Sequence, residues 1–207
     1  MLEAGCGTGR YVAALAERGY RVEGIDFAEE TIALVRKADP TLEVWAGDIR
    51  GIERPDGYYA AYVSLGVVEH FFEGPVEALE EAFRVLRSGG VALIAVPYLN
   101  RPRAGTLGRC EQAPGPELGE GLRFYQYYFS AARFSGLLGE AGFEVVEVVP
   151  FHLFGGLVRD WAIGRFLHRR QFFAWPMRRL AKEACLRAPA WLRAAYAHMN
   201  MFVCRRP

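Results

Sequence analysis

Three glycines at alternate positions, Gly5, Gly7 and Gly9, separate a short apolar segment from an amphipathic one. Glycine lets the backbone turn tightly and approach a ligand without a side-chain clash, and a helix after the loop offers free N–H groups at its start. The pattern therefore predicts a strand, a glycine loop and a helix in succession. A dinucleotide-binding loop needs its third glycine at position 10, where this chain has Arg10, so the spacing disfavours a pyrophosphate site.

The chain alternates between strand-like and helix-like segments as far as residue 150. Apolar periodicity and terminal signals predict helices over 10–18, 29–38, 75–90 and 130–143. Strands are predicted over 1–4, 20–26, 41–48, 58–65, 91–98, 143–150 and 199–206. This order predicts an α/β fold with a parallel sheet, helices on both faces and a ligand site at the carboxyl ends of the strands.

Length and composition fit one globular domain. The 207 residues are 52% hydrophobic, enough for a single well-buried core over 1–207. The glycine- and proline-rich stretch 98–124 interrupts the alternation and is predicted to be a long loop. Residues 151–198 form a basic, aromatic segment that we expect to be a helical insertion between the sixth and seventh strands.

Several classes of protein are disfavoured. No eighteen-residue apolar run is present, and the N-terminus lacks the basic start of a signal peptide. The four cysteines lie far apart, so neither a disulfide framework nor a metal site is expected, and a reducing cytoplasm is the predicted location. The net charge of +1 gives no field that would favour nucleic acid.

Two aspartates stand at the ends of predicted strands near the glycine loop. Asp26 ends the second strand, where its two oxygens can accept hydrogen bonds from both hydroxyls of a ribose. Asp48 ends the third strand, where its carboxylate can accept the amine of an adenine while Ile49 packs on the ring. Either aspartate alone is typical of a solvated loop or a helix cap, but together with the loop they indicate a nucleoside site.

In these residues the chain resembles the class I S-adenosylmethionine-dependent methyltransferases. The matching segments are LEAGCGTGR (2–10), VEGIDF (22–27), AGDI (46–49), YVSLGVVEHF (62–71) and VLRSGGVALIAVP (85–97). The resemblance implies a doubly wound, seven-stranded, mostly parallel sheet whose last strand is antiparallel, in a three-layer α/β/α sandwich. It also implies S-adenosyl-L-methionine as the cofactor and a Rossmann-like site for it.

The resemblance assigns roles to individual residues. It places the methionine part of the cofactor on the loop that holds Glu3, Gly5, Gly7 and Gly9. It gives Asp26 the ribose and Asp48 the adenine. It sets Phe27 and Ile49 beside the adenosine, and Leu65 and Gly66 beside the methionyl group.

The catalytic candidates follow the fourth strand. Glu69 and His70 lie beside the expected methyl group, and an imidazole there can take a proton from the acceptor. The alternative is that this pair only supports the cofactor pocket. Tyr125, Tyr127 and Tyr128 are candidates for an aromatic wall or for core packing, and His152 for a residue of a loop or lid.

The acceptor is constrained mainly by what is missing. The run after the fourth strand, Ser64 to Val68, lacks the (Asp/Asn)-Pro-Pro-Tyr motif of methyltransferases that act on amino groups of DNA bases or glutamine. A small-molecule acceptor is therefore predicted, with a lipid or sugar as variants. The competing hypotheses are a non-catalytic partner protein of the same fold and a nicotinamide- or flavin-dependent oxidoreductase, which Arg10 disfavours.

Two further expectations concern the basic segment and the N-terminus of the chain. The basic segment 157–198 is predicted to be a lid over the acceptor, with peripheral membrane contact as the second choice and the solvated face of ordinary helices as the simplest. The first strand begins at Met1, whereas similar proteins carry residues before it, so we expect an N-terminal truncation through a misread start codon. The sequence leaves the oligomeric state open.

Overall fold

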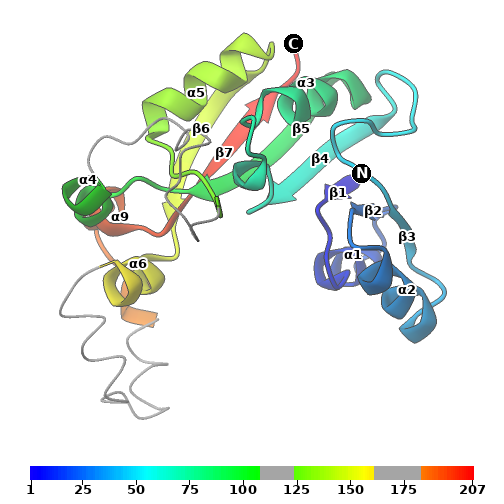
Figure 1. Ribbon diagram of the computed structural model, residues 1–207, viewed down its shortest axis with the longest axis horizontal. Coiled ribbons are helices and arrows are strands. Elements are labelled where there is room, and N and C mark those ends of the chain that lie inside the picture. Colours follow the sequence, from blue (N-terminus) through cyan, green and yellow to red (C-terminus); the bar gives the residue numbers. More distant parts are fainter. Residues whose placement is uncertain (108–123, 161–182) are drawn as a thin grey trace.

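The computed structural model describes residues 1–107, 124–160 and 183–207. Its centre is a seven-stranded sheet in the order β3-β2-β1-β4-β5-β7-β6 (Figure 1). The strands are Leu2–Ala4 (β1), Glu23–Asp26 (β2), Glu43–Ala46 (β3), Tyr59–Leu65 (β4), Leu86–Pro97 (β5), Glu144–Phe151 (β6) and Met199–Arg205 (β7). Strands β1 to β5 pair in parallel, and β7 runs antiparallel to both β5 and β6. The predicted sheet with its antiparallel last strand is confirmed.

The described helices either pack against the sheet through one of two separate cores or contact one another beyond the ends of β5 and β6. They are Arg10–Ala16 (α1), Glu29–Ala38 (α2), the 3-10 turn Val68–His70 (η1), Val76–Val85 (α3), Arg101–Leu107 (α4), Ala131–Glu140 (α5), Leu153–Arg159 (α6) and Ala190–Tyr196 (α9). Leu79 of α3 and Phe134 of α5 share one core with β4, β5 and β7, while α1 and α2 form another with β3 (Figure 1). Val44 and its neighbour Trp45 belong to different cores, because successive strand residues point to opposite faces.

The boundary between α3 and β5 differs from the prediction. The helix predicted over 75–90 ends at Val85, and β5 begins at Leu86 rather than at position 91. The N–H of Gly89 donates to the carbonyl of Arg206 at 2.8 Å, and the N–H of Arg206 donates to the carbonyl of Gly90 at 3.0 Å. The two glycines therefore pair with the end of the chain, a long-range contact that local helix signals do not report. The predicted cap of α5 is confirmed, since Ser130 Oγ accepts from the N–H of Arg133.

The two atypical segments are described only in part. The prediction of a loop over 98–124 is wrong for residues 101–107, which form α4. Directly after β5, Tyr98 also forms an isolated β-bridge with Phe129. Residues 108–123 of this stretch lie outside the described residues, as do 161–182 of the basic insertion, so most of the expected lid and membrane contact falls there. Among the helices in the described ranges, none has the length and apolar character needed to span a bilayer.

A buried polar cluster joins α4, the end of α6 and the start of β7. Arg103 Nε lies 3.0 Å from Asp160 Oδ1, and Asn100 Nδ2 donates to Asp160 Oδ2 at 2.7 Å. Arg103 also donates to the carbonyls of Tyr98 and His198 at 2.6 and 3.0 Å. Such a cluster is stable only because each buried polar group has a partner. It fixes the helices that stand beyond the ends of β5 and β6, at the same edge of the sheet as the glycine loop.

Candidate cofactor site

The candidate site lies where four neighbouring parallel strands end. In the sheet order β3-β2-β1-β4, strands β2 and β3 lie on one side of β1 and β4 lies on the other. The strand order therefore reverses between β1 and β4, and open α/β sheets bind ligands in the crevice at such a switch point. A cavity of about 620 Å³ opens there, a size suited to a small organic molecule. The loops after β1, β2, β3 and β4 all contribute to its lining.

The glycine loop has the conformation its sequence predicts. Gly5, Gly7 and Gly9 have φ angles of 78°, 49° and 70°, a region that residues with a Cβ rarely adopt. The N–H groups of Gly5 and Cys6 both donate to the carbonyl of Ile25, at 2.8 and 3.0 Å. A Cβ on Gly5 would lie 2.3 Å from Val67 Cγ2, so glycine here lets the loop after β1 touch the loop after β4.

Asp26 holds the glycine loop in place. Its Oδ2 accepts the N–H of Gly7 at 2.8 Å, and its Oδ1 accepts the N–H of Ala28 at 3.0 Å. Each carboxylate oxygen can accept a second hydrogen bond, so both oxygens keep capacity for a ligand diol. Ala28 precedes α2 and has no side chain that could cap it, and Asp26 binds the backbone there instead.

Glu3 lies beneath the loop and does not line the cavity among the described residues. The side chain is buried, and it accepts a hydrogen bond from the backbone N–H of Val12 at the start of α1. Burial raises the pKa of Glu3 to about 7, the hydrogen bond from Val12 opposes this, and the negative charge of Asp26 adds to it. Its position indicates support of the loop from below.

The loop after β3 supplies a charged and an apolar group. Asp48 receives Arg50 as a bidentate partner, with Arg50 Nη2 2.7 Å from Asp48 Oδ2, and this hydrogen bond lowers the pKa of Asp48. The guanidinium of Arg50 lies 4.7 Å from the centroid of the Phe71 ring, across the cavity mouth. Ile49 is buried in the main core, which is the core that α3 and α5 share with β4, β5 and β7, and it also lines the cavity.

His70 is held by a backbone carbonyl on its Nδ1 side. Nδ1 lies 2.7 Å from the carbonyl oxygen of Tyr125, and the two rings meet edge to face with centroids 5.2 Å apart. A carbonyl oxygen only accepts, so Nδ1 carries a hydrogen and the neutral imidazole has its lone pair on Nε2. The His70 side chain is 41% exposed and lines the cavity. It is therefore oriented to accept a proton at Nε2.

Glu69 stands behind His70 in a buried position. Its side chain is 2% exposed, Oε1 lies 3.9 Å from His70 Nε2, and Oε2 has no hydrogen-bond partner among the described residues. Burial raises the pKa of Glu69 to about 7, with its own backbone N–H opposing the shift. The carboxyl is therefore close to changing charge at neutral pH, next to the ring nitrogen that carries the lone pair.

Because the pKa of Glu69 is raised, we expect the stability of the folded protein to depend on pH. Because its pKa is about 7 in the folded protein and near 4.5 in an unfolded chain, the folded protein holds the extra proton between these values. The free energy of unfolding then falls as pH rises from 4.5 to 7, by roughly 3 kcal/mol for this group. Glu69→Gln should match the wild type in urea unfolding at pH 4.5 and exceed it by about that amount at pH 8. A difference independent of pH would contradict this account.

The structure brings together most of the predicted site residues. Those that line the cavity are Gly5, Asp26, Phe27, Asp48, Ile49, Leu65, Gly66 and His70. Phe27 is 82% exposed at the rim, free to cover a bound ring. In the described part of the chain Gly7, Gly9, Glu3 and Glu69 stand outside the lining, the first two within the loop and the two acids buried. Lining residues that the sequence analysis missed are Gly47, Arg50, Val67 and Phe71.

The other aromatic candidates do not line this cavity among the described residues. Tyr127 packs against the main core and donates its hydroxyl to the carbonyl of Phe72, while Tyr128 receives the guanidinium of Arg103 on its ring. His152 begins α6 in a left-handed conformation and lines a second cavity, of about 340 Å³, beside β6. Within the described ranges no three His, Cys, Asp or Glu side chains gather in a way that suits a metal ion.

Comparisons with known proteins agree with the geometry. Residues 2–94 match the family model described as a methyltransferase domain. A protein of Mycolicibacterium smegmatis named "Probable S-adenosylmethionine-dependent methyltransferase" is 33% identical over 153 residues, which are 73% of this chain and 55% of that protein. The malonyl-[acyl-carrier protein] O-methyltransferase of Serratia marcescens is 36% identical over 95 residues, 46% of this chain and 37% of that protein. The chain thus spans about half the length of such relatives, or less.

A solved structure shares the whole architecture. The S-adenosylmethionine-dependent methyltransferase of Mesorhizobium loti superposes with a TM-score of 0.64 at 16% identity, covering 99% of this chain and 89% of that one. The cavity also has the chemistry that such a cofactor needs: the glycine loop admits a close backbone approach, Asp26 and Asp48 offer carboxylate acceptors, and apolar side chains line the same space. Residues 2–94 therefore carry the methyltransferase domain of this family, and the described chain has the fold of the S-adenosylmethionine-dependent methyltransferases.

Proposed function

We propose that the protein transfers a methyl group from S-adenosylmethionine to a small-molecule acceptor in the cytoplasm. The observation that carries the proposal is the cavity at the ends of β1 to β4, where a glycine loop and two strand-end aspartates converge. The cofactor, when bound, would supply a methyl group on a sulfonium: in-line attack by the acceptor on the methyl carbon would break the carbon–sulfur bond and release S-adenosylhomocysteine. The protein's own task is to orient the reactants and exclude water.

Each wall of the cavity has a part in holding the cofactor. Asp26 would accept the ribose hydroxyls with the lone pairs that its bonds to Gly7 and Ala28 leave free. Asp48 would accept the adenine amine, and Phe27 and Ile49 would enclose the ring. Leu65 and Gly66 would line the methionyl group on the side where Val67 approaches Gly5 of the glycine loop.

His70 and Glu69 serve an acceptor that carries a proton on its nucleophile. As the acceptor atom forms its bond to the methyl group, its proton passes to Nε2 of His70, and the Glu69 carboxylate stabilises the imidazolium that results. The carbonyl of Tyr125 keeps the ring in the tautomer that can accept. An acceptor whose nucleophile is already a carboxylate does not need this step.

The relatives and a second cavity bear on the choice of acceptor. The Serratia relative is named for a malonyl group on an acyl-carrier protein, an acyl group that carries a carboxylate. The second cavity is lined mainly by apolar residues at the end of β6 and the start of α6, with Arg193 of α9 the one cation among its described lining. A lipid acceptor is therefore the second candidate, with its chain in that cavity and its polar group near Arg193.

His70→Ala tests the assignment of the base. With acceptors that react through a hydroxyl, the rate of S-adenosylhomocysteine formation is expected to fall about 100-fold or more, because proton transfer by a side chain contributes about that factor. The affinity for S-adenosylhomocysteine should change little, and added imidazole should restore part of the rate. With carboxylate acceptors the variant should keep most of its activity.

The same assay separates the enzyme from a non-catalytic relative. A panel of hydroxyl, amine, carboxylate and long-chain acceptors is incubated with labelled S-adenosylmethionine and the wild-type protein. Turnover with one class supports the proposal and names the acceptor. Tight cofactor binding with no turnover on any member would instead support a non-catalytic partner protein.

A further inference from the structure

The wall of the cavity formed by the loop after β3 has no secondary structure of its own. Residues 47–58, between β3 and β4, contain turns and bends but no helix. They nevertheless supply Gly47, Asp48, Ile49 and Arg50 to the cavity lining. A loop whose backbone is partly buried needs partners for its N–H and carbonyl groups, and these partners decide where its side chains stand.

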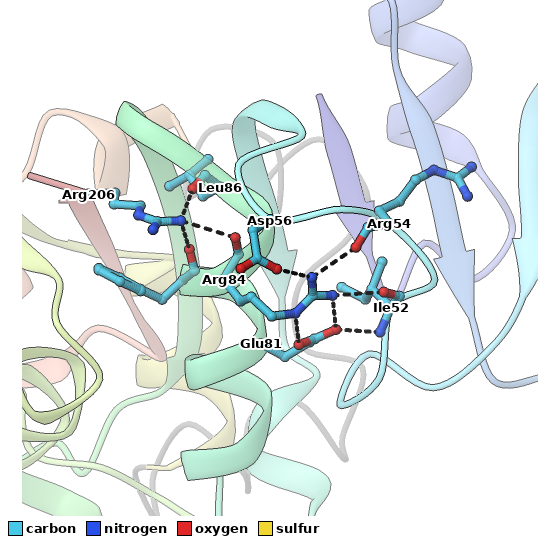
Figure 2. A network of polar contacts seen from close by, with 8 residues as sticks. Ile52, Arg54, Asp56, Glu81, Arg84, Leu86 and Arg206 are labelled. Carbon is cyan, nitrogen blue, oxygen red and sulfur yellow. Dashed lines mark hydrogen bonds and ion pairs between the residues drawn. The ribbon is translucent and has the colours of Figure 1, made fainter.

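The partners come from one face of α3. Glu77, Glu81 and Arg84 follow one another at spacings of four and three residues, so they lie in a row along the helix. Each contacts the loop. Glu77 lies 3.9 Å from Arg50. Glu81 binds Ile52, and Arg84 binds the carbonyl of Arg54 further along the loop (Figure 2). One helix face therefore supports the loop along most of its length.

Glu81 and Arg84 together bind both backbone polar groups of Ile52. Glu81 Oε1 accepts the N–H of Ile52 at 2.5 Å, and Arg84 Nη2 donates to the carbonyl of Ile52 at 2.9 Å. The two side chains also bind each other, with Arg84 Nε 2.7 Å from Glu81 Oε2 and Arg84 Nη2 2.7 Å from Glu81 Oε1 (Figure 2). We call Glu81 and Arg84 the α3 clamp.

Arg84 extends the clamp along the loop. Its Nη1 donates to the carbonyl of Arg54 at 2.9 Å and to Asp56 Oδ1 at 2.6 Å (Figure 2). The Arg84 side chain is 34% exposed, so its ion pairs as such contribute little to stability. What the guanidinium offers is geometry, because its planar fork directs several donors at fixed oxygens, which a lysine ammonium cannot reproduce.

The chain also leads directly from the opposite wall of the cavity into α3. α3 begins at Val76, shortly after Phe71, which lines the cavity on the side of β4. The guanidinium of Arg50 reaches from the clamped loop to the Phe71 ring, at 4.7 Å from its centroid. Since α3 is covalently joined to one wall and clamped to the other, it fixes the distance between them.

We propose that Glu81 and Arg84 are positioning residues that set Asp48 at the distance from which it recognises the adenine amine of the cofactor. The inference rests on the proposed function, because it takes the cavity to hold an adenosyl group. The clamp does not touch the cofactor. It acts through Ile52, four residues along the chain from Asp48, and thereby governs selectivity for adenine more than the stability of the fold.

A matched pair of variants on the same helix end tests the proposal. Arg84→Lys and Glu81→Gln keep the size of the side chains but cannot reproduce the set of hydrogen bonds. The control is Arg206→Lys: Arg206 donates to the carbonyls of Phe83, Arg84 and Leu86 at 2.5 to 3.0 Å, and among the described residues its guanidinium makes no hydrogen bond to the loop (Figure 2). The probes are S-adenosylhomocysteine and S-inosylhomocysteine, which differ at the 6-position of the base, and calorimetry gives both dissociation constants.

The wild type is expected to prefer the adenosyl ligand by about tenfold or more, because a site built to bind an NH group rejects the analogue lacking it. In Arg84→Lys and Glu81→Gln this preference should fall to within about threefold, mostly through weaker binding of the adenosyl ligand. Arg206→Lys should keep the wild-type preference even where its melting temperature falls as much.

Three results would overturn the inference, and they are distinguishable. A wild-type preference retained by both clamp variants shows that the clamp serves stability alone. If the wild type binds both ligands equally, Asp48 does not recognise the adenine amine and the clamp has no part in that recognition, while cofactor binding itself remains supported. A wild type that binds neither ligand contradicts the proposed function itself.

Discussion

Replacing Asp26 with alanine is expected to abolish cofactor binding, with a loss of affinity of about 100-fold or more. The carboxylate accepts the N–H of Gly7 and the N–H of Ala28, so it holds the glycine loop and the start of α2 in one arrangement. In the proposed complex it also accepts the ribose diol, and each charged hydrogen bond is worth about 1.5 to 3 kcal/mol. Loss of two such bonds accounts for the expected effect.

Equilibrium dialysis with labelled S-adenosylmethionine measures the Asp26→Ala effect directly. Asp39→Ala is the matched control, since Asp39 is another loop aspartate that accepts backbone and hydroxyl hydrogen bonds from Thr41, at an exposed turn away from the cavity. The control should bind as the wild type does. If the folded Asp26→Ala protein binds S-adenosylmethionine with a dissociation constant within threefold of the wild type, Asp26 does not bind the ribose.

Gly5→Ala is expected to produce the largest loss of stability among single substitutions in the glycine loop. The added Cβ would lie 2.3 Å from Val67 Cγ2 and 2.8 Å from Val67 Cγ1, at a φ of 78°. Valine is stiff at χ1 and cannot rotate both γ carbons away. Overpacking and left-handed strain together cost about 2 to 4 kcal/mol, or a fall in melting temperature of about 10 °C for a chain of this size.

Gly7→Ala is the internal control for that experiment. Gly7 also has a positive φ, 49°, but a Cβ there meets nothing within 4 Å. It should therefore cost only the conformational strain, about 1 kcal/mol. Thermal unfolding of the two apo variants compares them, and Gly5→Ala combined with Val67→Ala should recover part of the loss. Equal melting temperatures for Gly5→Ala and Gly7→Ala would contradict the close contact of the two loops.

The sequence predicts the sheet well because the signals for β1 to β5 are local. Alternating strands and helices with glycine and proline at their ends specify a parallel sheet, and the strand ends then specify an edge where Gly5, Asp26 and Asp48 must meet. The antiparallel β7 came from family resemblance, since its direction depends on pairing with β5 over a separation of about a hundred residues.

What the sequence does not predict depends on contacts between distant segments. Arg50 is one of many surface-like arginines in the sequence, and only the fold places it between Asp48 and Phe71. The α3 clamp is hidden for the same reason, because Glu81 and Arg84 look like the solvated face of an ordinary helix. The buried cluster around Arg103 and Asp160 likewise joins segments more than fifty residues apart.

The sequence pattern also does not predict that Glu3 and Glu69 are buried away from the cavity. Glu3 and Glu69 were predicted to bind the cofactor and to catalyse, respectively, yet both are buried and neither lines the cavity in the described part of the chain. Their raised pKa values follow from desolvation, which a sequence does not show. That Glu69 assists catalysis remains a prediction, now expressed through its distance of 3.9 Å from His70 Nε2.

A crystal structure of the protein with S-adenosylhomocysteine tests the central claim most directly. The account predicts the adenine between Phe27 and Ile49 with its amine on Asp48, the ribose hydroxyls on Asp26, and the homocysteine along Gly5 to Gly9. The sulfur should then face the side of the cavity that holds His70. Ligand bound outside this cavity, or bound inside it with the ribose remote from Asp26, would contradict the account.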